Sequence, residues 1–369
     1  MKNIFVLLLT LCGIVGILIY PEVSCDSAEQ AIEMCLTVLV PTLFPFLVLS
    51  GIFIKCGFAE RLGRLLDRFT KKVFCVGGNC SSAMILGLVS GFPVGAKTVS
   101  SLYKNGACSK VEAERTLAFC NNAGPSFILG TVGVGIWQSD KTGWLLWAVQ
   151  IVSAVFVGII VGRIWKGTAD TVVFVNTKNN IPQKQSVLHI FLSSVTDGAV
   201  SMLYICSFVV FFAVAVSLLL HTGLIPSISA AICKLFPFFE RETVENLLVG
   251  IFEMTTGVSR VGNSAPVLQN LAVTSALIGW AGISVHCQVL SYICDGGLSP
   301  KPYFIGKILQ TAFSTALIFI CSFLIPGYKA DILPASGIPQ ISVYALVCGA
   351  VVAVSLTVLF LLFRCKKTN

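Results

Sequence analysis

The stretch VGGNCSSAMILGLVSGFPVGAKTVSSLY, residues 76–103, decides how this chain folds. It is apolar enough for a membrane helix, yet glycine and proline interrupt it repeatedly, most densely at Gly91, Pro93 and Gly95. A lipid-facing helix cannot be broken at mid-depth, because each orphaned backbone group costs several kcal/mol there. The stretch is therefore predicted to be a re-entrant helical hairpin that is buried in protein or lines a cavity.

Composition places this hairpin in a membrane protein. Hydrophobic residues make up 56% of the 369 residues and charged residues only 11%, whereas roughly a quarter of a soluble domain is charged. The mean hydropathy is +0.89. These values exclude a soluble enzyme with one compact core, a disordered chain and a secreted disulfide scaffold.

The sequence carries no motif typical of an enzyme. The 15 cysteines have no C-x-x-C spacing and lie mostly in apolar runs, so they are predicted to be small buried hydrophobes. No metal cluster, catalytic triad or phosphate-binding loop is visible. We expect a protein that is not an enzyme, holds no metal or organic cofactor and binds no nucleic acid.

Eight apolar runs are long enough to cross a bilayer core of about 30 Å. They cover residues 4–20, 31–54, 116–137, 144–165, 195–220, 273–293, 302–325 and 341–363. A second interrupted stretch, residues 247–271, is predicted to be another re-entrant hairpin. Two amphipathic segments, near residues 58–69 and 225–239, are predicted to lie in the membrane interface.

The basic residues give the predicted orientation. If both hairpins return to the face they enter from, 20 of the 25 lysines and arginines lie on the cytoplasmic side and 5 outside. This bias predicts a multi-pass protein of the cell membrane with both termini in the cytoplasm.

The order of elements repeats. A shift of 166 residues aligns Gly57 with Gly223 and Gly91 with Gly257, and a later shift of 158 aligns Gly124 with Gly282. Because each unit has three crossings, the second is upside down, as in secondary transporters with inverted repeats. The predicted fold is thus an all-α polytopic bundle. Its parts are an N-terminal transmembrane helix (1–25), a first repeat (26–165, hairpin 76–104), a cytoplasmic linker (166–190), a second repeat (191–326, hairpin 243–272) and a C-terminal helix with a basic tail (340–369).

Three motifs carry a resemblance to a known family. They are the run Ser90-Gly91-Phe92-Pro93-Val94-Gly95-Ala96-Lys97, the run Glu112-Ala113-Glu114-Arg115, and the run Asn121-Asn122-Ala123-Gly124-Pro125-Ser126-Phe127. Together they resemble the YlbJ (SpoVV) family of sporulation integral membrane proteins, within the nucleoside-recognition (Gate) superfamily. The resemblance implies a fold similar to concentrative nucleoside transporters and the movement of dipicolinate across the outer forespore membrane.

The first-half candidates for substrate binding surround the helix breaks. Ser90, Gly91, Pro93 and Gly95 are predicted to form one wall, where half-helix amino termini offer positive potential to an anion. Ser90 either caps the second half-helix or donates to the ligand. Lys97 either pairs with a carboxylate or extends to the cytoplasmic face. The other first-half candidates are Asn121, Asn122 and Ser126; the asparagines either bind substrate or satisfy backbone groups freed by the break.

The second-half candidates lie in and after the second hairpin. Glu253 is predicted to be the ion-coupling residue, for H⁺ or Na⁺, and the alternative is a salt bridge to Arg260. The remaining substrate-binding candidates are Thr256, Ser259, Arg260, Ser284 and Gln288.

The predicted partners are a small anionic organic substrate and the lipid bilayer. Two alternatives stay open beside the dipicolinate carrier: a transporter of nucleosides or other small metabolites, and a non-transporting scaffold in spore envelope assembly. The sequence does not decide whether the chain forms a homo-oligomer.

Overall fold

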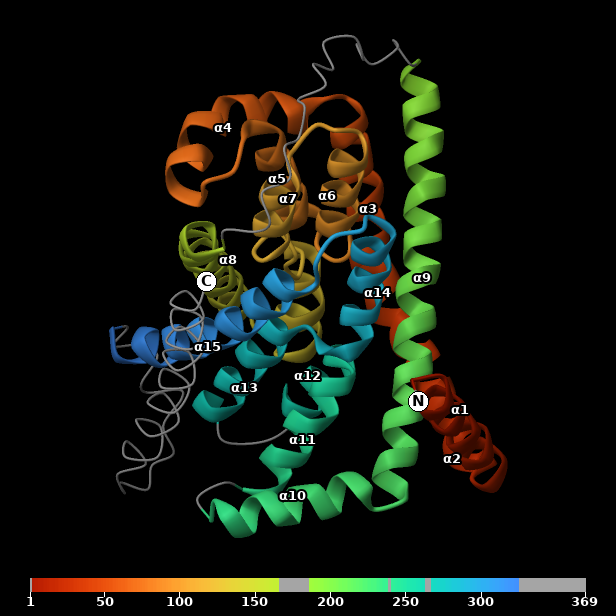
Figure 1. Ribbon diagram of the computed structural model, residues 1–369. Helices are drawn as coiled ribbons and strands as arrows, with labels where there is room; N and C mark the ends of the chain where they lie inside the picture. Colours follow the sequence, from red (N-terminus) through yellow and green to blue (C-terminus); the bar gives the residue numbers. More distant parts are fainter. Residues whose placement is uncertain (1, 166–185, 238–239, 263–266, 325–369) are drawn as a thin grey trace.

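The computed structural model describes residues 2–165, 186–237, 240–262 and 267–324, and every regular element in these ranges is a helix (Figure 1). The first half holds α1 (Lys2–Ile19), α2 (Pro21–Met34), η1 (Cys35–Leu39), α3 (Val40–Lys55), α4 (Phe58–Phe74), α5 (Gly78–Ser90), α6 (Val94–Lys104), α7 (Lys110–Leu117), η2 (Ser126–Ile136) and α8 (Asp140–Ile164). The second half holds α9 (Val187–His221), α10 (Leu224–Leu235), α11 (Arg241–Phe252), α12 (Met254–Gly262), α13 (Val267–Trp280), α14 (Gly282–Asp295) and α15 (Lys301–Leu324).

The prediction of an all-helical polytopic membrane protein is confirmed. Five described segments are long and apolar enough to cross a membrane, and a sixth is possible if the α4–α5 pair, bent by 91°, counts as one. The five are Pro21–Lys55, Asp140–Ile164, Val187–His221, Leu268–Asp295 and Lys301–Ser322. Of the other three predicted spans, residues 4–20 form α1, residues 116–137 are divided between α7 and η2, and residues 341–363 lie outside the described ranges, as does most of the predicted linker.

The span formed by α2 and α3 contains a π-helical turn, η1. Pro41 follows this turn directly, and it has no N–H to donate to the carbonyl of Thr37. The turn widens where that hydrogen bond is missing. Pro41 therefore acts on the turn before it.

The same order of helices occurs twice. A long helix (α3 or α9) leads through a left-handed glycine (Gly57, φ 73°; Gly223, φ 76°) into a flanking helix (α4 or α10). A pair of short helices (α5–α6 or α11–α12), an interrupted pair (α7–η2 or α13–α14) and another long helix (α8 or α15) follow. Figure 1 shows α4 at one end of the bundle and α10 at the opposite end, both running across the direction of α9.

Each pair of short helices is a hairpin whose ends meet. The arms have 13, 11, 12 and 9 residues, or about 14–20 Å at 1.5 Å per residue, too short to cross about 30 Å. In the first hairpin Asn79 Nδ2 donates to the carbonyl of Ala107 (2.7 Å). In the second half, Gln269 Nε2 at the start of α13 donates to Thr243 Oγ1 on the first arm of the hairpin (2.9 Å).

Glycines allow the hairpin arms to approach each other. A Cβ on Gly87 would collide with the carbonyl of Cys120 and lie 3.3 Å from Gly95 Cα, and one on Gly257 would collide with Gly250 Cα. Gly95 and Gly257 thus hold equivalent places on the second arms. The turn of the first hairpin has three residues, Gly91 to Pro93, whereas that of the second has one, Glu253. The expected alignment of Gly91 with Gly257 is therefore displaced by a few residues.

The first hairpin is anchored by the charged run at the start of α7. Ser109 and Glu112 form a reciprocal cap, and Glu112 Oε1 also accepts from the N–H of Gly77 (2.9 Å). The buried Glu114 accepts from Trp165 Nε1 and from the N–H of Ser299, both at 3.0 Å. These carboxylates fix α7 to α5, to the end of α8 and to the segment before α15.

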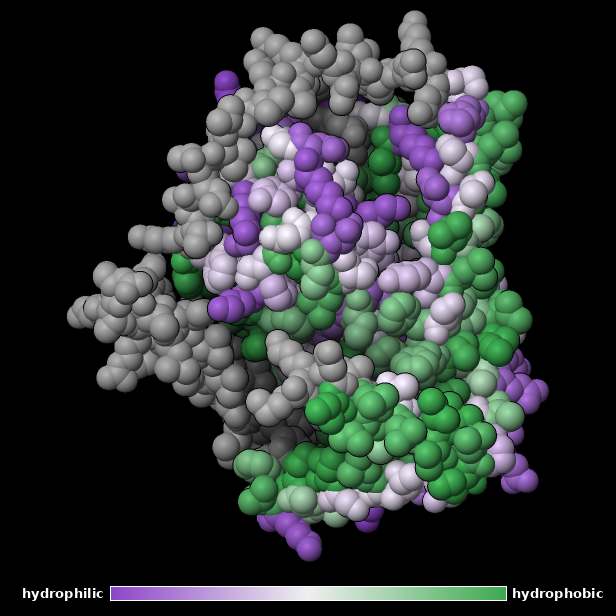
Figure 2. Space-filling view, turned by 45° about the vertical axis from the view of Figure 1, so that its right-hand side comes forward, coloured by the Kyte–Doolittle hydropathy of each residue, from purple (hydrophilic) through white to green (hydrophobic). Residues whose placement is uncertain are grey.

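The exterior is apolar along the helices that would meet lipid. Large hydrophobic side chains are exposed on α9, α10 and α4, among them Leu203, Phe211, Leu235 and Leu65. Figure 2 shows a broad hydrophobic surface over the lower part of the molecule, with hydrophilic groups concentrated toward the upper end. This distribution is what a bilayer requires of an integral membrane protein.

Candidate substrate site

A small cavity of about 60 Å³ lies where the helix breaks of the two halves meet. The first half contributes the turn at the end of α5 and the start of η2; the second half contributes the start of α12 and of α14. Its polar lining includes Ser90, Ser126, Glu253, Ser284 and Gln288. Gly91 lines the cavity as well, so six of the predicted site residues come together from segments up to nearly 200 positions apart.

Close backbone contacts hold each hairpin turn against the break in the following helix pair. A Cβ on Gly91 (φ 75°) would lie 2.6 Å from the nitrogen of Gly124, and one on Gly282 (φ 77°) would lie 2.9 Å from the nitrogen of Met254. Positive φ angles and such contacts both require glycine. Gly91 therefore lies directly against the backbone of Gly124.

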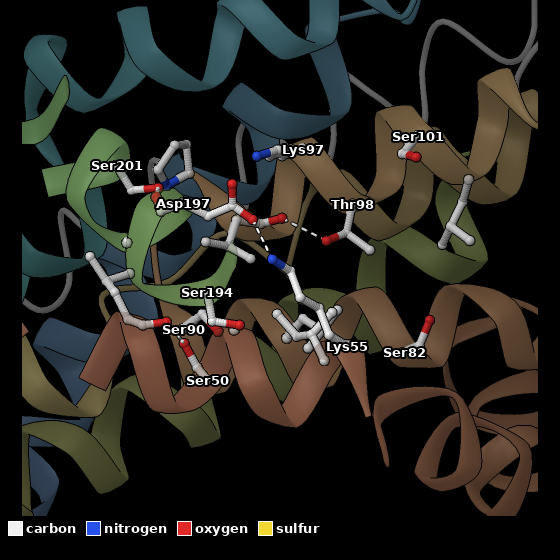
Figure 3. Close-up of a pocket in the computed structure, with 18 of the residues that line it drawn as sticks. Ser50, Lys55, Ser82, Ser90, Lys97, Thr98, Ser101, Ser194, Asp197 and Ser201 are labelled. Carbon is white, nitrogen blue, oxygen red and sulfur yellow. Dashed lines mark hydrogen bonds and ion pairs between the residues drawn. The ribbon is translucent and has the colours of Figure 1, made fainter. Parts of the chain in front are cut away.

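A larger vestibule of about 540 Å³ adjoins the cavity. Leu47 and Ser90 line both spaces, so Ser90 stands where they join. Figure 3 shows Lys55 of α3 reaching Asp197 of α9, with Lys97 of α6 nearby. The ion pair measures 2.7 Å between Lys55 Nζ and Asp197 Oδ2.

Lys97 is exposed and lines the vestibule. It forms no ion pair with the described residues, unlike the neighbouring Lys55. Pro93, which precedes α6 directly, lines the same space, whereas Gly95 packs against the Cys120 carbonyl. Lys97 is thus the available cation at the opening toward Ser90.

Ser90 is the last residue of α5 and is 6% exposed. It does not cap α6: Pro93 holds the cap position and no side chain accepts from the first turn. Its Oγ has no hydrogen-bond partner among the residues that the structure describes. A buried hydroxyl left without a partner at the junction of two cavities is available to donate to a ligand.

The adjacent asparagines serve the helix break. Asn121 Nδ2 donates to the carbonyl of Leu117 (3.1 Å) and Asn122 Nδ2 to that of Phe119 (2.8 Å). Their amide nitrogens thus satisfy carbonyls at the end of α7, the second of the two interpretations that the sequence left open. Neither lines the cavity. Asn121 Oδ1 has no partner within the described ranges.

Glu253 occupies the turn of the second hairpin and is 1% exposed. Its carboxylate accepts from the N–H groups of Thr255 (3.0 Å) and Thr256 (2.5 Å), so it caps the amino terminus of α12. The alternative of a salt bridge to Arg260 is wrong: no ion pair of Glu253 occurs in the described part of the chain. Arg260 Nε donates instead to Asn246 Oδ1 (2.9 Å).

The other second-half candidates divide into two groups. Ser284 and Gln288, on successive turns of α14, are buried and line the cavity. Thr256 and Ser259 lie further along α12 and do not line it, and neither does Arg260, which is exposed. Ser284 and Gln288 therefore belong to the cavity, and the three candidates on α12 lie outside it.

The sequence reasoning missed a buried polar network on α15. Lys307, 1% exposed, donates to Gln310 Oε1 (2.8 Å) and to the carbonyl of Gly279 (3.2 Å). Gln310 Nε2 donates to Asn122 Oδ1 (2.6 Å) and Gln150 Oε1 (3.2 Å). A lysine six residues inside the 302–325 run was the signal that could have identified it.

Comparisons with known proteins agree with these motifs. Residues 36–126 match the family described as nucleoside recognition (Gate). The sporulation integral membrane protein YlbJ of Bacillus subtilis (strain 168) is 28% identical over 328 residues, which are 84% of this chain and 80% of YlbJ. No solved structure matches. The chain is a multi-pass membrane protein that carries a Gate segment and is similar to YlbJ over most of its length.

Proposed function

We propose that this protein is a secondary transporter of a small organic anion. The observation that carries the proposal is the cavity built from the helix breaks of both halves. Interrupted helices are costly in a membrane unless they line a cavity, and a scaffold would have no need of them. In secondary transporters such breaks form the substrate site near the middle of the bilayer.

The repeated order of helices supports an inverted repeat. The flanking helices α4 and α10 lie at opposite ends of the bundle (Figure 1), as expected if one unit is upside down. The hairpin ends that meet at Asn79 and at Thr243 support re-entrant hairpins. Two opposed units around one site provide the rocking motion of alternating access.

The chemistry of the cavity suits an anion. The amino termini of η2, α12 and α14 all border it, and unpaired N–H groups at a helix start attract negative charge. Glu253 already occupies the start of α12 with its own carboxylate. We assign to Glu253 the coupling role, with H⁺ or Na⁺ as the ion, because a buried carboxylate at a substrate cavity can bind either.

The vestibule supports an opening on the cytoplasmic side. It is lined by Asp197 and by Lys55 and Lys97, two of the basic residues that the orientation count assigns to the cytoplasm, and it reaches Ser90. We interpret this arrangement as a carrier open to the cytoplasm. Lys97 then provides the first positive charge that an anion from that side meets.

Dipicolinate, which the family resemblance implies, is our proposed substrate. The name of the relative YlbJ connects that protein with sporulation, and the outer forespore membrane is the corresponding location. The Gate match supports a second candidate, a nucleoside, because that family is described as nucleoside recognition.

Uptake into liposomes tests the proposal. Purified full-length protein should accumulate labelled dipicolinate, and excess unlabelled dipicolinate should compete where uridine does not. Lys97→Gln should lower uptake, whereas the control Lys72→Gln, an exposed lysine of α4 outside both cavities, should not. Uptake of uridine alone would favour the nucleoside carrier, and uptake of neither would contradict transport.

A further inference from the structure

Lys307 is a buried lysine beside the cavity, and the proposed transport role gives it no part. Its ammonium is surrounded by uncharged groups: the Gly279 carbonyl, the Gln310 side chain and the ring of Phe92, whose centroid lies 4.9 Å from Nζ. The described residues give it no carboxylate partner. A buried, unpaired charge is costly, and it is retained in membrane proteins chiefly for function.

The ring of Phe92 connects this ammonium to the cavity. Of the three groups that contact Nζ, only Phe92 also lines the cavity. Phe92 belongs to the turn of the first hairpin, between Gly91 and Pro93. It is partly buried and packs against both main hydrophobic clusters of the molecule. Any movement of this turn relative to α15 would change the contact between the ring and the ammonium.

The three protons of the ammonium match these three neighbours. Two are donated to oxygen atoms, and the third direction is covered by the ring through a cation–π contact. A cation–π contact is weaker than a charge-assisted hydrogen bond to a carboxylate. The oxygen contacts can therefore persist while a carboxylate replaces the ring.

We infer that Lys307 binds a carboxylate of the transported anion and that Phe92 occupies this position in the empty carrier. The inference rests on the proposed transport of an organic anion. Binding exchanges the ring for a carboxylate, so the substrate favours the state in which the first hairpin turn has moved away from α15. Charge recognition and hairpin movement thereby depend on the same lysine.

This arrangement explains a difference between the two cationic sites. Lys97 is exposed in the vestibule, where solvent and salt weaken its attraction for an anion. Lys307 is screened from solvent, so its attraction for a carboxylate is stronger and less dependent on salt. We therefore expect Lys97 to affect the rate of association and Lys307 to affect affinity.

Equilibrium binding of labelled dipicolinate to the full chain in lipid nanodiscs tests the inference. Lys307→Gln should weaken binding by at least about tenfold, and Lys307→Arg should retain more of it. The matched control is Lys301→Gln, an exposed lysine on the same helix. Pyridine-2-carboxylate has one carboxylate, whereas dipicolinate has two. If Lys307 binds only one carboxylate of dipicolinate, Lys307→Gln should weaken the binding of pyridine-2-carboxylate less than it weakens that of dipicolinate.

A second variant does not depend on the stability of Lys307→Gln. Phe92→Leu removes the ring and keeps an apolar side chain, so it should tighten dipicolinate binding by about 2- to 30-fold. A gain in affinity cannot result from misfolding. Unchanged or weaker binding in Phe92→Leu, or wild-type affinity in Lys307→Gln, would overturn the inference while leaving transport intact. Failure of the wild-type protein to bind or transport dipicolinate would instead refute the proposed function, and this inference with it.

Discussion

The side chain of Gln310 donates to Oδ1 of Asn122 at 2.6 Å, and this bond joins a helix break of the first half to a long helix of the second. The same Nε2 also donates to Gln150, and Gln310 Oε1 accepts from Lys307. Every group of Gln310 is thus engaged in a buried network. Such networks fix one arrangement of packed helices, because each broken contact leaves a buried polar group without a partner.

This bond predicts that Gln310→Leu destabilises the protein. Asn122 Oδ1 and Lys307 Nζ would each lose a partner, at about 1–3 kcal/mol per stranded group. Thermal unfolding in detergent measures the loss. The double variant Gln310→Leu/Asn122→Leu should lose less stability than the sum of the losses of the two single variants. Strict additivity would show that the two side chains do not interact.

The position of Glu253 predicts a separation of exchange from accumulation. Glu253→Gln keeps an acceptor for the α12 amino terminus but cannot carry a proton or a negative charge. It should therefore support exchange of dipicolinate across liposomes loaded on both sides and fail to accumulate it against a gradient. The control is Glu245→Gln, at a partly buried carboxylate of α11 that pairs with the exposed Arg241. Normal accumulation by Glu253→Gln would remove Glu253 from coupling.

The contact of Gly87 with the break after α7 predicts a steric effect. The added methyl group of Gly87→Ala would meet the Cys120 carbonyl, and overpacking of this kind costs about 1–3 kcal/mol. Melting temperature and uptake should both fall. Gly13→Ala, where no atom lies within 4 Å of the new Cβ, should leave both unchanged or slightly raise stability.

The hairpin ends predict a labelling pattern in a cysteine-free background. Cysteines placed at Asn79 and Ala107 should react with an impermeant maleimide from one side of the membrane. Cysteines at Thr243 and Gln269 should react from the other side, because a hydrogen bond joins the start of each hairpin to the segment that follows it. Labelling of Asn79 and Ala107 from opposite sides would mean that this hairpin crosses the membrane.

Much of the fold could be predicted from the sequence because its determinants are local. The length of an apolar run sets whether a helix can span, and glycine and proline set where it breaks. Residues 76–103 therefore gave a hairpin with its turn at Gly91–Pro93, and the repeated Gly57 and Gly223 marked two equivalent turns. The start of α7 is also local, because the cap is formed by Ser109 and Glu112, which are three residues apart.

Tertiary structure decided where the polar side chains lie and which groups they contact. Lys307 lies near the start of a long apolar helix, and packing of α15 against α13, α8 and α7 buries it. Ser90 could cap a helix by position, but the turn at Phe92 directs it to the cavities instead. Spacing along the chain fixes backbone geometry over a few residues, whereas burial and hydrogen-bond partners depend on segments more than a hundred positions away, which meet only when the two halves pack together.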